Sequence, residues 1–358
     1  MVVYLIMPNN YHNKIQFNGI IENKFIETLV QKFKRSPIQQ NALQESDAEL
    51  IRIPGTTITI ALTIDSVVEE IERGLYTDPY LIGWMTVVSN VSDLAAVGAE
   101  PIGILLNETL PPGLGMDYLN RLQQGIHDAC SESKIYVLGG DTNFSSNIQM
   151  SACAIGYLPD GDPVKRIGCK PGDHLFSSGK LGQGSSYAYL KFSGGSSMNI
   201  GHSHYKPKPR LQEGQIIRKY ASSCMDTSDG FIPAIDQLMR LNHVGFNVDT
   251  SLMQFIHPEA IDLSQKAQIP LWMMLAGPHG EFELIFTIPD TSVDAFLKSA
   301  SVLNWEPCAL GKVIEDKELK LLQKDKFITL ETGKIRNLFN EVNGNMDKYI
   351  KGLFSFNY

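Results

Sequence analysis

LIGWMTVVSNVSDLAAVGA, residues 81–99, is a long apolar run with helical rather than strand periodicity. The apolar side chains on or near one face of such a helix are Leu81, Trp84, Met85, Val88, Leu94, Ala95 and Val97. Gly98 follows the run, as glycine often follows the end of a helix. The stretch therefore predicts a helix that packs into a core.

Polar residues interrupt this run near its middle, at Asn90, Ser92 and Asp93. A carboxylate is costly to bury unless a cation or several hydrogen-bond donors meet it. Two interpretations are open: Asp93 lies on a solvated helix face, or it belongs to a buried group of acids. Other Asp-bearing apolar segments along the chain favour the second interpretation.

Length and composition restrict the class of protein. The chain has 358 residues, enough for about two domains, and its 43% hydrophobic and 20% charged fractions are typical of soluble globular proteins. A net charge of -8 does not favour a nucleic-acid partner. Five cysteines without CxxC spacing, and an apolar opening too short to be a signal or to span a bilayer, predict a cytoplasmic protein without a membrane partner.

Strand and helix patterns alternate along the whole chain. In the first half we expect helices within 18–41, strands at 50–54, 57–64 and 102–110, and a helix at 117–131; residues 1–10 are also compatible with a strand. In the second half we expect strands at 174–178 and 245–249, helices at 211–221 and 231–241, and a mobile loop at 194–203. The linker composition PDGDP, residues 159–163, predicts two domains, 1–159 and 160–358, in an α/β (α+β) protein.

Aspartates recur where these elements end. Asp47 precedes the first strand of a predicted hairpin and Asp65 ends the second, so the hairpin can bring both carboxylates to one sheet edge; both are also ordinary turn residues. Gly139-Gly140-Asp141 follows another strand. This glycine pair permits a close backbone approach, and a plain hairpin turn explains it equally well.

The segment MDTSDG, residues 225–230, carries two carboxylates three residues apart. Asp226, Ser228 and Asp229 together are typical of an oxygen-ligand site for Mg²⁺. Alternatively, Ser228 or Asp229 is the N-cap of the helix at 231–241, which would explain one aspartate but not both.

These residues suit phosphate chemistry through magnesium. Carboxylates hold hard cations, which neutralise phosphate oxygens, and Arg166 can meet a phosphate with two parallel hydrogen bonds. The chain has no P-loop, HExxH or nucleophile motif. Phosphoryl transfer needs positioning and charge neutralisation more than covalent catalysis.

The chain resembles the thiamine-monophosphate kinases, in the superfamily of aminoimidazole-ribonucleotide synthetase, HypE and selenophosphate synthetase. The resemblance runs from about Asp47 to about Pro289. The motifs that carry it are VSNVSDLAAVGAEP (88–101), LGGDT (138–142), KRIGCKPGD (165–173), KPKPR (206–210), MDTSDG (225–230) and FELIFTIP (282–289).

The resemblance implies a fold and a reaction. We expect an aminoimidazole-ribonucleotide-synthetase-like fold, in which the N-terminal sheet pairs with that of a second subunit as a barrel-like homodimer core, beside a C-terminal α+β domain. ATP and several Mg²⁺ ions are expected in the cleft. Thiamine phosphate then attacks the γ-phosphate of ATP directly, giving thiamine diphosphate and ADP.

The resemblance also assigns roles to residues. The implied Mg²⁺ ligands are Asp47, Thr63, Asp65, Asp93, Asp141, Asp226 and Asp229. Of these, Asp141, Asp226 and Asp229 are the expected catalytic residues. Arg166 and Ser228 are expected to contact ATP, with Gly140 and Asp141 beside its phosphates.

Several positions depart from the family pattern. The paired acids of GDDAA are replaced by SDAEL, so Ser46 stands for the first acid, and Ile64 replaces a usual threonine. The substrate-side histidine falls on Glu72, and GGEDYEL is replaced by GPHGEFEL, which leaves His279 or Gly280 and Glu281 at the substrate-contacting positions. Glu72, His279 and Glu281 are thus our predicted acceptor-side residues.

Because the acceptor side is altered, two further functions are compatible with the sequence. One is an ATP-dependent synthetase of the same superfamily, which activates an amide or carbonyl oxygen. The other is a nucleotide-binding paralogue without catalytic activity.

Overall fold

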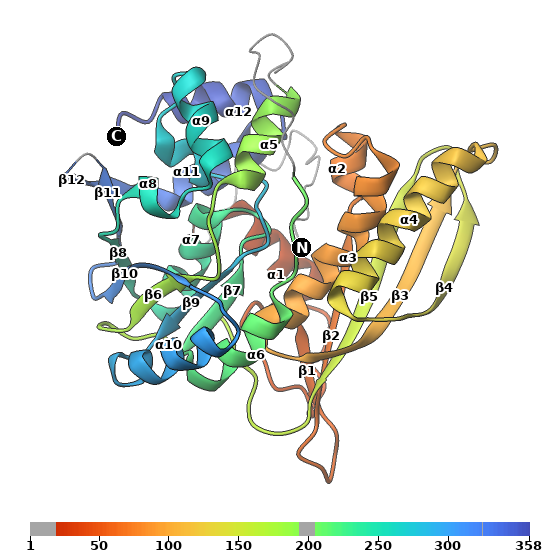
Figure 1. The fold of residues 1–358 in the computed structure, drawn as a ribbon, viewed down its shortest axis with the longest axis horizontal. Coiled ribbons are helices and arrows are strands. Elements are labelled where there is room, and N and C mark those ends of the chain that lie inside the picture. The colour runs from red at the N-terminus through yellow and green to blue at the C-terminus, as the bar shows by residue number, and fades with distance from the viewer. Residues whose placement is uncertain (1–18, 193–204, 324) are drawn as a thin grey trace.

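The computed structural model describes residues 19–192, 205–323 and 325–358 (Figure 1). The expected strand at 1–10 and the expected mobile loop at 194–203 lie outside these residues. Two β-sheets form the framework, one from each half of the chain. No helix within the described ranges is long and apolar enough to cross a membrane.

The first sheet contains five strands in the order β1-β2-β5-β3-β4. Its strands are β1 (Glu49–Arg52), β2 (Thr59–Ser66), β3 (Glu100–Leu110), β4 (Val137–Phe144) and β5 (Gln149–Leu158). The helices of this half are α1 (Ile21–Val30), α2 (Val68–Glu72), α3 (Pro79–Ala96) and α4 (Met116–Ser133). The predicted hairpin is confirmed, since β1 and β2 pair antiparallel with Glu49 opposite Leu62. Only α1 forms within the expected helical region 18–41 that is described.

The predicted turn at Gly139–Thr142 is wrong. These residues lie within β4, which runs parallel to β3 at the edge of the sheet, with Asn107 opposite Asp141. β5 pairs with β2 and β3 instead of with β4. A Cβ on Gly140 would lie 2.2 Å from the carbonyl oxygen of Leu106, so this glycine serves the contact between β3 and β4.

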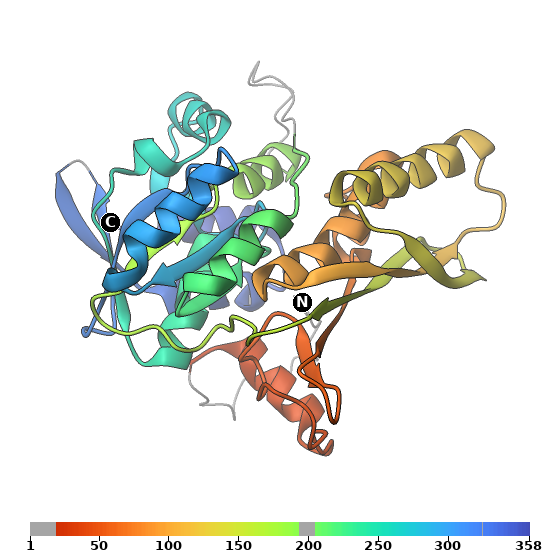
Figure 2. The ribbon, with the colours of Figure 1, turned by 60° about the horizontal axis from the view of Figure 1, so that its bottom comes forward.

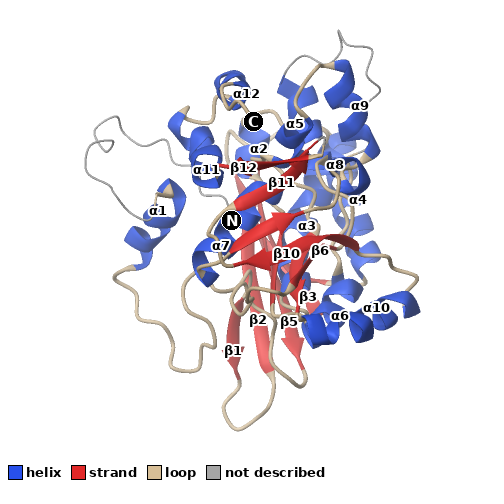
Figure 3. Ribbon diagram, turned by 90° about the vertical axis from the view of Figure 1, so that its left-hand side faces the viewer, coloured by secondary structure: helices blue, strands red, loops and turns tan. Residues whose placement is uncertain are grey.

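The second sheet contains seven strands in the order β12-β11-β8-β10-β6-β9-β7. Figure 3 labels β12, β11, β10 and β6 of this sheet. Its strands are β6 (His174–Ser177), β7 (Ser223–Asp226), β8 (Gly245–Val248), β9 (Leu284–Ile288), β10 (Cys308–Ile314), β11 (Leu319–Gln323) and β12 (Lys326–Leu330). The α-helices are α5 (Gln183–Phe192), α6 (Leu211–Tyr220), α7 (Phe231–Asn242), α8 (Leu252–Phe255), α9 (Pro258–Lys266), α10 (Val293–Val302), α11 (Thr332–Glu341) and α12 (Met346–Phe354); short 3₁₀ helices occupy Leu271–Leu275 and Asp290–Ser292.

Helix α3 lies between the two halves of the molecule (Figure 2). Every residue from Ile82 to Ala96 is buried, as the apolar run predicts. Glycines allow α4 to pack closely on it: a Cβ on Gly125 would lie 2.0 Å from the carbonyl oxygen of Tyr80. On the other side, a Cβ on Gly214 of α6 would lie 2.1 Å from the carbonyl oxygen of Ala95. The helix is therefore enclosed by elements of both halves.

Two apolar cores flank the second sheet because successive side chains of a strand point to opposite faces. Phe176 of β6 and Phe286 of β9 join the core that contains α3, whereas Leu175 and Ile285 join a second core with α7. The termini of β7 and of the first hairpin meet beside α3, where the polar residues of the apolar run are found.

Candidate active site

Three carboxylates meet where the two halves join. Asp47 precedes β1, Asp93 lies on α3, and Asp226 ends β7. One oxygen from each lies within 4.8 Å of the others, which is close enough for all three to bind one cation. They are the only such group of metal-ligating side chains among the residues described.

Hydrogen bonds hold these carboxylates in place. Arg166 pairs with Asp47 at 2.8 Å, and both side chains are largely buried. The hydroxyl of Ser92 donates to Asp226 at 2.6 Å. The hydroxyl of Thr63 donates to Asp93 through a short bond. The cluster is therefore oriented by Ser92 of the apolar helix together with Thr63 and Arg166 from other segments.

The cluster contains more negative than positive charge. Burial raises the pKa of Asp93 well above its usual range, and the charges of Asp65 and Asp226 raise it further. Burial likewise raises the pKa values of Asp65 and Asp226, and the charge of Asp47 adds to each shift. Such shifts arise where like charges share a site without enough counter-charge.

A divalent cation fits this arrangement. The donor set consists of carboxylate and hydroxyl oxygens, the ligands that Mg²⁺ prefers. In addition, Oδ2 of Asp47 and Oδ1 of Asp229 are buried and have no hydrogen-bond partner in the described structure. Buried polar atoms are normally satisfied. A cation bound by Asp47, Asp93 and Asp226 would satisfy Asp47, and Asp229 is a further unsatisfied acid of the same cavity.

The interpretation of Asp93 as a solvated residue is wrong, because its exposed fraction is only 7%. Its neighbour Asn90 is fully buried and positions β2 by accepting a 2.8 Å hydrogen bond from the backbone of Asp65. The N-cap interpretation of Ser228 and Asp229 is also wrong. Gly230 is the N-cap of α7 and no side chain caps this helix.

Asp229 follows β7 and lies beside the cluster. Burial raises its pKa to about 7, and the nearby charge of Glu22 on α1 raises it as well. Ser228 donates to Asp226 through both its hydroxyl, at 3.0 Å, and its backbone nitrogen, at 3.3 Å. The Asp-Thr-Ser-Asp segment thus supplies carboxylates and orients one of them.

A cavity of about 540 Å³ opens beside the cluster. It is lined by residues of both halves. From the predicted set they are Asp47, Thr63, Asp65, Asp93, Arg166, Ser228 and Asp229. Asp226 is bonded to Ser228 at the wall of this cavity. The structure therefore brings together eight of the residues predicted from sequence.

Asp141 and Gly140 are not among the residues that line the cavity. Both lie in β4, whose eight residues are all exposed, and Asp141 accepts a 2.7 Å hydrogen bond from Asn143. Their predicted roles at the phosphates remain predictions.

The three acceptor-side residues are also separate from this cavity. Glu72 is exposed at the end of α2. His279 is buried among aromatic rings and bonds to the hydroxyl of Tyr76 at 3.2 Å; burial lowers its pKa to about 3. Glu281 accepts a 2.8 Å hydrogen bond from the backbone of Gly182, and burial raises its pKa to about 8.

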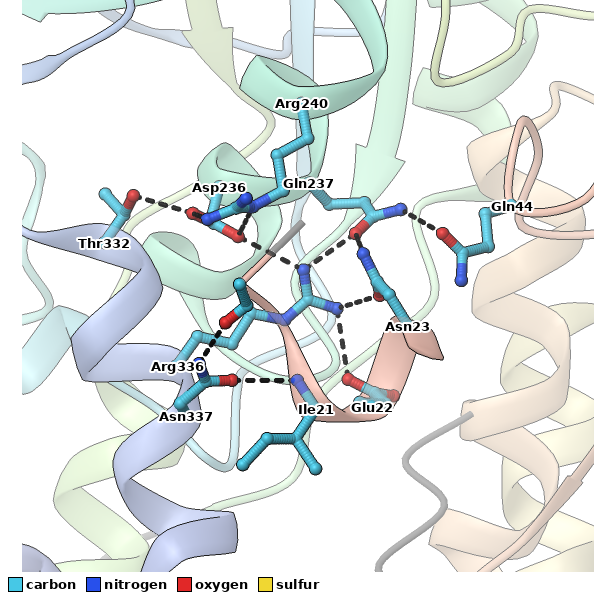
Figure 4. A network of polar contacts seen from close by, with 11 residues as sticks. Ile21, Glu22, Asn23, Gln44, Asp236, Gln237, Arg240, Thr332, Arg336 and Asn337 are labelled. Carbon is cyan, nitrogen blue, oxygen red and sulfur yellow. Dashed lines mark hydrogen bonds and ion pairs between the residues drawn. The ribbon is translucent and has the colours of Figure 1, made fainter. Parts of the chain in front are cut away.

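Other cavity residues were not predicted from sequence. They include Glu22, Asn23, Gln44, Ser46, Gln237 and Arg336. Arg336 of α11 bonds to Glu22 and Asn23 of α1, each at 3.0 Å, and to Gln237 of α7 at 2.7 Å (Figure 4). Glu22 and Arg336 are 314 positions apart in sequence, so no local spacing could have indicated this pairing.

The fold and the buried carboxylates define a class of protein. The family model described as AIR synthase related protein, N-terminal domain, matches residues 45–158. A solved structure described as AaThiL complexed with AMPPCP and TMP is similar with a TM-score of 0.67 and 22% identity, covering 86% of this chain and 94% of that one. The molecule therefore has the AIR-synthase-related fold.

Sequence relatives identify the branch. A thiamine-monophosphate kinase of Methanospirillum hungatei is 33% identical over 58% of this chain and 68% of its own length. Another, of Buchnera aphidicola from Acyrthosiphon pisum, is 28% identical over 78% of this chain and 89% of its own length. The chain belongs to the thiamine-monophosphate kinase family.

Proposed function

We propose that this protein transfers the γ-phosphoryl group of ATP to thiamine phosphate, with Mg²⁺, and forms thiamine diphosphate and ADP. The observation that carries the proposal is the cluster of Asp47, Asp93 and Asp226 at the wall of a cavity that can hold a small molecule. The solved relative described as complexed with AMPPCP and TMP supports the choice of nucleotide and acceptor.

In this proposal the chain's own residues bind and orient the reactants. Asp47, Asp93 and Asp226 would hold Mg²⁺, which neutralises phosphate oxygens when bound. Arg166 lines the same cavity and its pKa lies above its usual range because of the charge of Asp47, so it is a permanent cation for the phosphates. No covalent intermediate on the protein is required.

The proposal also covers the assembly of the molecule. A homodimer through the first sheet is supported by exposed apolar side chains on and next to its edge: Ile102, Leu105, Tyr136, Val137, Leu138 and Phe144. β4 is an edge strand that a second copy could cover. Domains 1–159 and 160–358 are proposed from the two sheets, and a cytoplasmic location from five cysteines that are all unpaired.

The test of the activity is a measurement of ADP release with ATP and Mg²⁺. We expect release that depends on thiamine phosphate and yields thiamine diphosphate by mass spectrometry. Amide-bearing metabolites serve as comparison acceptors, because a superfamily synthetase would respond to these instead. ATP analogue binding by calorimetry distinguishes a non-catalytic paralogue, which would bind nucleotide but release no ADP with any acceptor. Either of those results would refute the proposed kinase reaction.

A further inference from the structure

The loop that carries Asp47 also presents two uncharged hydrogen-bond donors to the cavity. Nε2 of Gln44 and the hydroxyl of Ser46 are buried and, within the described structure, have no partner. Both residues line the cavity, and Ser46 is only 8% exposed. A buried donor without an acceptor costs free energy, so these donors indicate a missing ligand.

The hydrogen-bond chain behind Gln44 fixes which end of its amide faces the cavity. Arg336 can only donate, and its Nη1 donates to Oε1 of Gln237 at 2.7 Å. Nε2 of Gln237 then donates to Oε1 of Gln44 at 3.1 Å (Figure 4). Oε1 of Gln44 is thereby directed at Gln237, and the NH₂ group is the end of the amide that has no partner in the described structure.

The backbone of this loop is held in an uncommon conformation. Gln44 has a φ of 65°, in the left-handed region that few residues other than glycine adopt. The loop is secured at its next residue, where the backbone nitrogen of Arg166 donates to the carbonyl oxygen of Glu45 at 2.8 Å. Strain of this kind persists where surrounding contacts fix it, often at binding sites.

We propose that Gln44 and Ser46 form a direct binding subsite for oxygens of the nucleotide's phosphate chain, beside the carboxylate cluster. The inference rests on the proposed ATP-dependent function and adds two residues to it. Both groups can donate, and Nε of Arg166, a third donor that lines this cavity, also has no partner in the described structure. Phosphate oxygens only accept, whereas the edge of a nucleobase such as adenine presents both a donor and an acceptor. The Gln44 NH₂ and the Arg166 Nε–H can only donate, and a serine hydroxyl can donate as well. The subsite therefore fits phosphate better than a base.

The proposal gives a physical role to Ser46, which replaces the first acid of the family's GDDAA pattern. Where the family pattern has an acid, this chain has a hydroxyl. An acid there would repel phosphate unless a cation lay between them, whereas a hydroxyl donates to phosphate directly. Part of the phosphate contact in this chain is thus independent of Mg²⁺.

The experiment compares variants of the full chain by calorimetry, with ADP and with inorganic tripolyphosphate as probes, in Mg²⁺ and in EDTA. Ser46→Ala removes one donor, and Gln44→Glu replaces the cavity-facing NH₂ with a charged acceptor of the same shape. Each should weaken binding of both probes about tenfold or more. Matched controls are Ser133→Ala, whose hydroxyl is also buried and unpartnered but does not line this cavity, and the exposed Gln40→Glu.

A second pair of variants, Ser46→Asp and Ser46→Asn, distinguishes the effect of a negative charge at position 46 from the effect of a larger side chain. Ser46→Asp should lose affinity for ADP in EDTA, and Mg²⁺ should restore part of it, whereas the uncharged Ser46→Asn should show a much smaller dependence on Mg²⁺. The thermal unfolding midpoint of Ser46→Ala should be nearly unchanged, because no existing hydrogen bond is broken. This measurement checks that the variant is folded.

Three results would overturn the subsite. One is unchanged ADP affinity in both Ser46→Ala and Gln44→Glu. Another is a variant whose affinity for ADP falls while its affinity for tripolyphosphate does not, which would place the donors at the base or ribose. The third is a wild-type protein in which tripolyphosphate neither binds nor competes with ADP. If one of these three results is found and the wild-type protein still releases ADP with thiamine phosphate, only the subsite is refuted and the proposed function stands. If the wild-type protein binds no nucleotide, both proposals are refuted.

Discussion

The hydroxyl of Ser92 donates a 2.6 Å hydrogen bond to Oδ2 of Asp226, across 134 positions of sequence. Ser92 lies on α3, which packs against the first sheet, and Asp226 ends β7 of the second sheet. This bond joins the two halves at the carboxylate cluster. A cation held there would contact both halves at once.

Replacing Asp226 with Asn should abolish Mg²⁺-dependent nucleotide binding and leave the fold intact. The amide keeps the shape of the carboxylate but lacks its charge, and the thermal midpoint should stay the same or rise because a buried charge is removed. Binding of an ATP analogue is measured by calorimetry with and without Mg²⁺. Asp162→Asn, at a highly exposed carboxylate, is the control. An unchanged affinity in Asp226→Asn would show that this residue is structural only.

Arg336→Ala should release α1 from the rest of the molecule. Arg336 and Glu22 are 10% and 11% exposed, and the loss of Arg336 leaves a nearly buried carboxylate unpaired. We expect a loss of about 2–4 kcal/mol in the free energy of unfolding, with faster hydrogen exchange in α1. Lys334→Ala in the same helix removes an exposed ion pair with Glu331 and should have little effect. Equal exchange in α1 for both variants would contradict this role of Arg336.

Glu281 should make the protein less stable as pH rises. Burial raises its pKa in the folded state to about 8, above its ordinary value of 4.5. The stabilisation from this group is therefore complete below about pH 4.5 and is lost as pH rises through about 8. Between pH 5 and 9 the wild-type protein should lose on the order of 2–4 kcal/mol relative to Glu281→Gln. Chemical unfolding at several pH values measures this, and parallel curves for the two proteins would show that Glu281 titrates normally.

Leu138→Arg should convert the proposed homodimer to a monomer. Leu138 is 50% exposed on β4, the edge strand through which the first sheet would pair with a second copy. A charge there would have to be buried without a partner. Sedimentation velocity measures the oligomeric state.

Phe327→Arg is the matched control for this prediction. Phe327 is 53% exposed on β12, which is the edge strand of the second sheet. This variant should remain dimeric. If both variants dissociate, or neither does, the interface does not lie on β4.

Much of the framework could be predicted from sequence because its signals are local. The helix at 79–96, the β1–β2 hairpin and the amphipathic α4 all follow from side-chain periodicity and turn residues. In the Asp-Thr-Ser-Asp segment, two carboxylates three residues apart are more than one helix cap explains. The hairpin-turn interpretation of Gly139–Thr142 is wrong for a clear reason: a glycine pair is compatible with both a turn and a close backbone approach, and here Gly140 allows β4 to approach β3.

Residues that reach the cavity from distant segments could not be predicted in this way. Gln44, Gln237 and Arg336 are unremarkable in sequence, and they form one hydrogen-bond chain only because the loop before β1, α7 and α11 meet (Figure 4). The positions of the predicted acceptor-side residues also depend on contacts between distant segments. The position of His279 in the GPHGEFEL segment predicts a substrate contact, but its side chain packs among tyrosines and does not line the cavity.

The sequence by itself determined the family, the two-sheet α/β architecture and most of the acidic residues of the site, because periodicity and motif spacing are properties of neighbouring residues. Only the tertiary structure decided which acids lie close enough to share one cation, that Asp93 is buried, and which end of the Gln44 amide is left without a partner. These depend on distances between segments and on the exclusion of water, and both arise only when the two halves pack around α3.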